Sequence, residues 1–146
     1  MKADNYIKME FPSKSVNEGF ARAAVACFAA SLDPTLDELG DIKTAVSEAV
    51  TNAAVHAYPD AIGKISLRAR IYDGNILEIV IKDWGIGIEI VAKARVPMFT
   101  TGGEDRSGMG FTIMESFMDK LRVRSVRGRG TTVTMTRRIG VKSQKC

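Results

Sequence analysis

The sequence predicts an α/β fold in one domain: a two-layer sandwich whose mixed β-sheet is covered on one face by α-helices. Segments that alternate apolar and polar residues, as strands with one solvated face do, occur near both ends of the chain and in its middle. Segments with apolar residues three and four positions apart, typical of amphipathic helices, separate them. We expect all 146 residues to belong to this domain, with a core over about residues 8–138 and a frayed tail at 140–146.

Two helices are predicted in the first part of the chain. Ser15 and Glu18 have the spacing of a capping box, in which each side chain satisfies a free backbone N–H at a helix start. The apolar face expected for this helix consists of Phe20, Ala23, Ala24, Cys27 and Phe28. A second capping box at Thr35 and Glu38 predicts a second helix, which should run to about His56.

Five segments alternate in the way that strands do, and two more segments are helical in pattern. The expected strands are 6–11, 65–71, 77–81, 121–126 and 131–138. A tight-turn sequence, Asp73-Gly74-Asn75, joins the second and third of them into a hairpin. The further helices are a short one at 89–95 and a longer one at 109–117, which follows a polar, glycine-rich loop.

The composition is ordinary for a globular protein and narrows the classes of function. Hydrophobic residues make up 45% of the chain and charged residues 26%. No segment is apolar for long enough to span a bilayer and no secretory signal opens the chain, so we expect a cytoplasmic protein without membrane contact. The net charge is +4, but the most basic stretch, residues 122–138, has no aromatic residue for base stacking. We therefore expect no direct contact with nucleic acid.

The second predicted helix carries a carboxylate and an amide at the edge of its apolar stripe. Glu48 and Asn52 stand four residues apart and share a helix face. A carboxylate in that position can act as a general base, and an amide oxygen can ligate Mg²⁺ beside phosphates. A half-exposed helix flank without any role has the same pattern, so this spacing alone leaves both interpretations open.

Two glycine-containing segments have the chemistry of a nucleotide site. Asp83 ends a predicted strand and opens the sequence Asp83-Trp84-Gly85-Ile86-Gly87, where its carboxylate can accept a hydrogen bond from an exocyclic amine. The two glycines allow a ligand to approach the backbone closely. Arg106-Ser107-Gly108-Met109-Gly110-Phe111 leads into a predicted helix, whose free N–H groups and dipole favour an anion. Each segment taken singly also fits an ordinary turn.

Taken in order, these motifs, followed by Gly130-Thr131-Thr132, resemble the ATP-binding superfamily of gyrase, the Hsp90 chaperones, histidine kinases and MutL, which implies a Bergerat-type fold. Within it, the chain is similar to the anti-sigma-factor serine kinases, above all those of sporulation. The segments that carry this similarity are Asn17 to Arg22, Leu32 to Thr35, Ser47 to Ala53, Phe99 to Thr101 and Arg106 to Glu115. Trp84 and a short lid at 102–105 depart from the family pattern.

The resemblance implies a role for each matching residue. Glu48 is expected to be the general base and Arg106 to steady the γ-phosphate, so that both are catalytic. Asn52 is expected to hold Mg²⁺, and Asp83 to bind adenine. The other nucleotide-binding positions implied are Gly85, Gly87, Thr100, Thr101, Ser107, Gly108, Met109, Gly110 and Thr131. Arg22 matches a position that contacts protein partners in the family.

The function that the resemblance implies is twofold. The chain is expected to bind and inhibit a sporulation sigma factor of RNA polymerase. With ATP and Mg²⁺ it is expected to phosphorylate a serine of an anti-anti-sigma factor, and to work as a homodimer. One alternative is a detached histidine-kinase-like catalytic domain, although no helix with a phospho-acceptor histidine precedes the domain. Another is a nucleotide-gated binding module without catalysis, against which Glu48 argues because binding alone needs no base.

Overall fold

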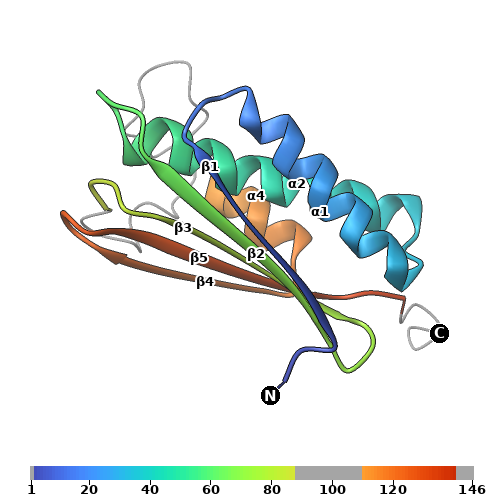
Figure 1. The fold of residues 1–146 in the computed structure, drawn as a ribbon. Helices are drawn as coiled ribbons and strands as arrows, with labels where there is room; N and C mark the ends of the chain where they lie inside the picture. Colours follow the sequence, from blue (N-terminus) through green and yellow to red (C-terminus); the bar gives the residue numbers. More distant parts are fainter. Residues whose placement is uncertain (1, 88–109, 141–146) are drawn as a thin grey trace.

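A computed structural model of the chain describes residues 2–87 and 110–140. It has two layers, with the helices packed on one face of a five-stranded sheet (Figure 1). The strands are β1 (Asn5–Pro12), β2 (Lys64–Tyr72), β3 (Ile76–Asp83), β4 (Lys120–Val126) and β5 (Gly130–Arg138). The helices are α1 (Asn17–Ala29), α2 (Leu36–Asn52) and α4 (Gly110–Phe117), with a 3-10 turn at Ala30–Leu32 and a π-helical turn at Ala53–Ala57. The helix predicted at 89–95 lies outside the described residues.

All neighbouring strands of the described sheet are antiparallel, in the order β1-β2-β3-β5-β4. The two-layer α/β class is therefore confirmed, but the expectation of a mixed sheet is wrong. Two successive helices connect β1 to β2. Because the chain reverses direction on entering each helix and again on entering β2, it runs through β2 antiparallel to β1. The strands β3 and β4 run in the same direction, but β5 inserts between them, so they are not neighbours.

The core lies between the sheet and the helices. Buried and outward side chains alternate along β2 and β3, as the sequence pattern predicts for a sheet covered on one face. The helix α2 lies over the sheet with Ile42 and Val46 fully buried. The inward side chains of the sheet include Ile65, Leu67, Ile71, Leu77, Ile79, Ile81, Val133 and Met135. No helix in the described ranges has the length and apolar character needed to cross a membrane.

One of the two predicted capping boxes is present. At the start of α2, the Glu38 N–H donates to Thr35 Oγ1 at 3.1 Å, and the Thr35 N–H donates to Glu38 Oε1 at 2.9 Å. The box predicted for α1 is wrong, because that helix begins after Val16 without a side-chain cap. Glu18 accepts a hydrogen bond from Ser47 on α2 instead, so its carboxylate joins two helices rather than closing the end of one.

The buried face of α1 also differs from the predicted one. Ala21, Val25 and Ala29 are fully buried, whereas Phe20 is 63% exposed and Cys27 is exposed. The small side chains of the buried stripe allow α1 to lie closely against α2, which a face containing phenylalanine would not allow. The helix therefore turns Phe20 away from the core, whereas Phe28 is partly buried against it.

Candidate nucleotide site

The ends of four elements meet at one end of the molecule, at the left in Figure 1. Asn52 is the last residue of α2, Asp83 is the last residue of β3, and Gly110 is the first residue of α4. A Cβ atom placed on Gly110 would lie 3.0 Å from the Asn52 Nδ2 atom, so α4 begins directly beside that amide. The Thr131 N–H, near the start of β5, donates to Asp83 Oδ1 at 3.2 Å. Two close contacts between residues far apart in the sequence thus lie at this end of the fold.

Asp83 is held as a buried acceptor. It is only 5% exposed, and its Oδ1 atom accepts hydrogen bonds from the N–H groups of Gly85, at 3.0 Å, and Thr131. Burial raises the pKa of Asp83 above its usual value, and these two hydrogen bonds oppose that effect only in part. Within the described residues, no hydrogen bond reaches Oδ2. The structure therefore offers a desolvated carboxylate oxygen to a ligand with an N–H group.

The loop that follows Asp83 is fixed against the end of the α2 segment. After Asn52 the chain forms the π-helical turn, and the Ala57 carbonyl accepts a hydrogen bond from the Ile86 N–H at 2.9 Å. Gly85 packs so closely here that a Cβ atom would lie 2.1 Å from the Ala57 oxygen. This close contact requires glycine at position 85. The π-helical turn beside it is a feature that is frequent at functional sites.

Tyr58 provides a second anchor for the same loop. Its hydroxyl accepts a hydrogen bond from the Trp84 N–H at 2.7 Å and donates one to the Lys64 carbonyl at 2.7 Å. Gly63 leaves room for the ring, since a Cβ atom there would lie 2.1 Å from a Tyr58 ring carbon. One side chain thus ties the start of β2 to the loop that follows β3. Sequence reasoning did not identify Tyr58, because nothing local indicates that its hydroxyl meets residues six and 26 positions away.

The turn between β4 and β5 closes the loop from the other side. The Gly128 N–H donates to the Ile86 carbonyl at 2.7 Å. Gly87 has φ +79°, a conformation open mainly to glycine, and a Cβ atom there would lie 2.5 Å from the Val126 oxygen. Gly85 and Gly87, predicted as ligand-approach positions, therefore also allow backbone to pack on backbone.

Glu48 lies one turn before Asn52 on α2 and is half-buried, at the edge of the core. The neighbouring Ser47 connects this helix to α1: its Oγ atom donates to Glu18 Oε2 at 2.6 Å and accepts from Arg22 Nη1 at 3.4 Å. Arg22 also pairs with Glu18 at 3.2 Å. The expected partner-binding arginine is thus held directly beside the helix that carries Glu48.

The described residues of the predicted site gather at this end of the fold, apart from Arg22, which lies on α1. They are Glu48, Asn52, Asp83, Gly85, Gly87, Gly110 and Thr131. The remaining predicted residues lie outside the described part of the chain: Thr100, Thr101, Arg106, Ser107, Gly108 and Met109.

Comparison with known proteins agrees with this geometry. The profile of the histidine kinase-like ATPase domain family matches residues 11–137. The chain therefore belongs to this family, and membership implies a nucleotide-binding domain.

The curated relatives narrow the comparison. The chain is 56% identical to the anti-sigma F factor of Caldanaerobacter subterraneus subsp. tengcongensis over 141 residues, which cover 96% of this chain and 98% of the relative. It is 53% identical to the anti-sigma F factor of Clostridium kluyveri, over 90% of this chain and 93% of the relative. It is similar to these anti-sigma F factors over nearly the whole of each chain.

Two solved structures share the fold. A crystal structure of RsbU and RsbW domains from Mycobacterium tuberculosis aligns with a TM-score of 0.66 at 20% identity, over 92% of this chain and 32% of that one. A mycobacterial sensor histidine kinase, MprB, aligns with a TM-score of 0.59 at 18% identity, over 91% of this chain and 98% of that one. At these identities the likeness extends to the fold alone.

Proposed function

We propose that this chain is an anti-sigma factor that sequesters a sporulation sigma factor, sigma F, and phosphorylates a serine of its anti-anti-sigma factor with ATP and Mg²⁺. The observation that carries the proposal is the close approach of Asn52 to the first residue of α4, at the same end of the fold as the buried carboxylate of Asp83. An amide, a helix start and a desolvated acceptor are the groups that a metal-bound triphosphate and an adenine amine require. The sigma-factor part of the proposal is supported by the relatives that are named anti-sigma F factor.

We assign the recognition of adenine to Asp83 and to the loop that follows it. Its Oδ2 atom can accept a hydrogen bond from the exocyclic amine, while the bonds to Oδ1 hold the carboxylate in place. Gly85, Gly87 and Thr131 form the surrounding backbone. The desolvated setting strengthens a hydrogen bond to the charged acceptor.

The phosphates are assigned to the start of α4. Free N–H groups at a helix start favour an anion, and the resemblance assigns Ser107, Gly108, Met109 and Gly110 to this approach. Asn52 is the residue that would hold Mg²⁺, and the ion would supply positive charge to offset that of the phosphates. Thr100 and Thr101 are assigned to the border of the nucleotide, and Arg106 to the γ-phosphate.

Glu48 is the proposed general base for transfer. The serine oxygen of the substrate forms a bond to the γ-phosphorus as its proton moves to the Glu48 carboxylate, and the bond from that phosphorus to the bridging oxygen breaks to release ADP. Glu48 and Asn52 share a face of α2 because they stand four residues apart. This spacing supports the proposal, because the proposed base would lie one helical turn from the residue proposed to hold the metal.

The kinase reaction is tested with purified chain, radiolabelled ATP, Mg²⁺ and the anti-anti-sigma factor of the same organism. We expect an acid-stable phosphoserine on that protein, none with Glu48→Gln, and unchanged ATP affinity in the variant. An acid-labile product would favour the histidine-kinase alternative. Binding of ATP and sigma factor without any phosphoprotein would leave a nucleotide-gated binding module. Sedimentation of the purified chain tests the homodimer that we include in the proposal.

A further inference from the structure

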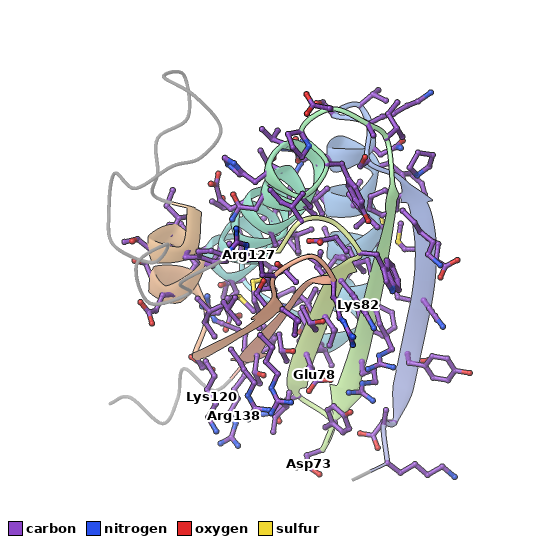
Figure 2. All side chains as sticks on the ribbon, turned by 90° about the vertical axis from the view of Figure 1, so that its left-hand side faces the viewer. Asp73, Glu78, Lys82, Lys120, Arg127 and Arg138 are labelled. Carbon is purple, nitrogen blue, oxygen red and sulfur yellow. The ribbon has the colours of Figure 1, made fainter. Side chains whose placement is uncertain are left out.

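A row of three polar side chains crosses the end of the sheet, on the face that packs against the helices. Ser125 of β4 lies opposite Thr131 of β5 in the strand register, and both side chains point to that face. The Thr131 N–H donates to Asp83 Oδ1, at the end of β3, so Asp83 is the third member of the row. In Figure 2, Lys82 and Arg127 mark this end of the sheet.

The polar row begins where the apolar core ends. The inward residues two positions further into the three strands are Ile81, Val133 and Val123. Asp83 is 5% exposed and Thr131 is 8% exposed, and Ser125 is half-buried. Burying polar groups costs free energy unless they are hydrogen-bonded, so this row suits a polar ligand better than further packing of the core.

The hydroxyl groups of Ser125 and Thr131 are hydrogen-bonded to each other. Ser125 Oγ and Thr131 Oγ1 lie 2.8 Å apart, and either oxygen can be the donor. Ser125 Oγ also lies 3.2 Å from the Gly130 carbonyl oxygen. Hydrogen bonds between a hydroxyl and an oxygen are rarely longer than about 3.0 Å, and a serine has one proton to donate. The shorter contact therefore receives that proton, and the proton of Thr131 is directed away from Ser125.

We propose that Ser125 is a positioning residue for the nucleobase. By donating to Thr131, it turns the Thr131 proton toward the ring nitrogen that lies beside the amine of adenine. This inference rests on the proposed function, in which Asp83 and Thr131 already belong to the adenine site, and adds Ser125 to that site. Asp83 accepts from the amine, and Thr131 donates to the nitrogen either directly or through one water molecule.

The direction of the Thr131 proton determines which base the row accepts. With that proton turned to the base, the protein presents an acceptor, Asp83, beside a donor, Thr131. Adenine has the complementary order, an amine donor beside a ring-nitrogen acceptor, whereas guanine has an oxygen acceptor beside a ring N–H. Guanine would leave both buried groups of the protein unpaired, and a site built in this way discriminates strongly between the two bases.

The two hydrogen-bonding groups of Thr131 have separate tasks. Its backbone N–H holds Asp83 Oδ1, and its hydroxyl meets Ser125. A substitution that removes only the hydroxyl therefore leaves the backbone bond to Asp83 in place. Because Ser125 acts on the base through Thr131, its substitution should alter recognition of the ring nitrogen and preserve recognition of the amine by Asp83.

The test compares ATP with 1-deaza-ATP, in which a C–H group replaces the ring nitrogen beside the amine. Calorimetry with Mg²⁺ measures the affinity of the full-length chain for each nucleotide. We expect the wild type to bind 1-deaza-ATP about three- to tenfold more weakly than ATP, which corresponds to the loss of one hydrogen bond. In Ser125→Ala and in Thr131→Val, ATP affinity should fall and the ratio of the two affinities should shrink to about twofold or less. Thr132→Val is the matched control, because its side chain points to the outer face, and it should keep the wild-type ratio.

The ratio of affinities does not depend on the fraction of folded protein, because both nucleotides are measured on the same sample. If the wild type binds 1-deaza-ATP as tightly as ATP, the inference is overturned and nucleotide binding stands. If Ser125→Ala weakens both nucleotides equally and keeps the wild-type ratio, Ser125 has only a structural role and the inference is again overturned. Absence of ATP binding by the wild type would overturn the proposed function itself, together with the role of Ser125.

Discussion

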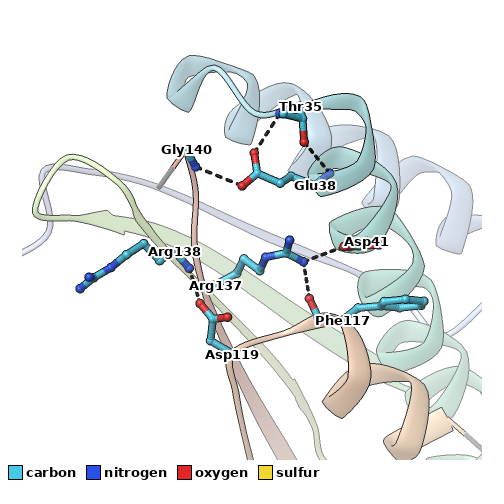
Figure 3. A network of polar contacts seen from close by, with 8 residues as sticks. All are labelled: Thr35, Glu38, Asp41, Phe117, Asp119, Arg137, Arg138 and Gly140. Atoms are coloured by element: carbon cyan, nitrogen blue, oxygen red, sulfur yellow. Dashed lines mark hydrogen bonds and ion pairs between the residues drawn. The ribbon is translucent and has the colours of Figure 1, made fainter. Parts of the chain in front are cut away.

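Arg137 of β5 and Asp41 of α2 form an ion pair at 2.9 Å across the edge of the core (Figure 3). The same Nη1 atom donates to the Phe117 carbonyl, at the end of α4, at 2.5 Å. One guanidinium thus joins the last strand to two helices. Because α2 and α4 carry Asn52 and Gly110, this contact stabilises, from the opposite end, the helix pair that frames the candidate site.

Replacing Arg137 by Met should lower the free energy of unfolding by about 2 kcal/mol, since it leaves Asp41 and the last carbonyl groups of α4 without their cation. Arg138→Met is the matched control, because the exposed side chain of Arg138 is not bonded to Asp119; only its backbone N–H is. The control should cost less than about 0.5 kcal/mol. Urea unfolding measures both, and equal losses would contradict the role given to Arg137.

Glu38 should stabilise the fold in a pH-dependent way. Burial alone would raise its pKa, but hydrogen bonds from the Thr35 N–H, the Gly140 N–H and the Thr35 hydroxyl, with the charge of Arg137, outweigh burial and lower it. A lowered folded pKa means that the stabilisation is complete above about pH 4.3, the ordinary Glu value, and is lost as the pH falls through the folded value. In urea unfolding, the stability difference between wild type and Glu38→Gln should therefore shrink on acidification. A difference that stays constant down to pH 3 would contradict this.

Asp83→Asn should separate binding from stability. The amide offers a donor where a charged acceptor is needed, so ATP affinity measured by calorimetry should fall about 10- to 100-fold. The raised pKa of Asp83 means that the folded state holds its proton more tightly than the unfolded state. Stability therefore falls as the pH rises from about 3.9, the ordinary Asp value, through the raised value. At pH 7 the variant should be at least as stable as the wild type, and a large loss of stability would argue that Asp83 is a structural residue.

Tyr58→Phe tests whether the hydroxyl positions the loop after β3. The change removes the bonds to the Trp84 N–H and the Lys64 carbonyl while leaving the ring in place. We expect a loss of about 1 kcal/mol in stability and a several-fold weaker affinity for ATP. Tyr72→Phe is the control, because Tyr72 lies on the outer sheet face, where Arg70 covers its ring. Unchanged ATP affinity in Tyr58→Phe would show that the loop needs no such anchor.

Gly85→Ala and Gly40→Ala form a matched pair. A methyl group on Gly85 would lie 2.1 Å from the Ala57 carbonyl oxygen, so the loop must shift and ATP binding should be lost. Gly40 lies inside α2 with no atom near its added methyl group, and alanine there should stabilise the helix by about 0.5–1 kcal/mol. Thermal unfolding and ATP titration measure both variants. Normal ATP affinity in Gly85→Ala would show that the close contact is not required.

The sequence predicts those parts of the fold that depend on local pattern. The strands around Ile65 and Leu77 and the start of α2 at Thr35 follow from alternation and capping. The direction of neighbouring strands does not, because the insertion of β5 between β3 and β4 is a property of the whole sheet. The buried face of α1 was mispredicted because its alanines give little hydrophobic signal beside Phe20.

The candidate site also has residues that the local sequence predicts and residues that depend on tertiary structure. Asp83 and the glycines after it could be identified because their motif is contiguous in the sequence. The contribution of Tyr58 could not, since its two partners are fixed by tertiary structure. The ion pair of Arg137 with Asp41 joins residues 96 positions apart and has no signal in the sequence for the same reason.

The π-helical turn at Ala53–Ala57 makes the site sensitive to the length of the chain as well as to its residues. One residue fewer in this turn would restore ordinary helical geometry and rotate all that follows by about 100°. The carbonyl at Ala57 and the hydroxyl of Tyr58 would then face away from the loop they hold, although every side chain named in the site would still be present. Deletion of a single alanine from this turn would therefore keep every residue of the site but would break the contacts that hold the loop after β3.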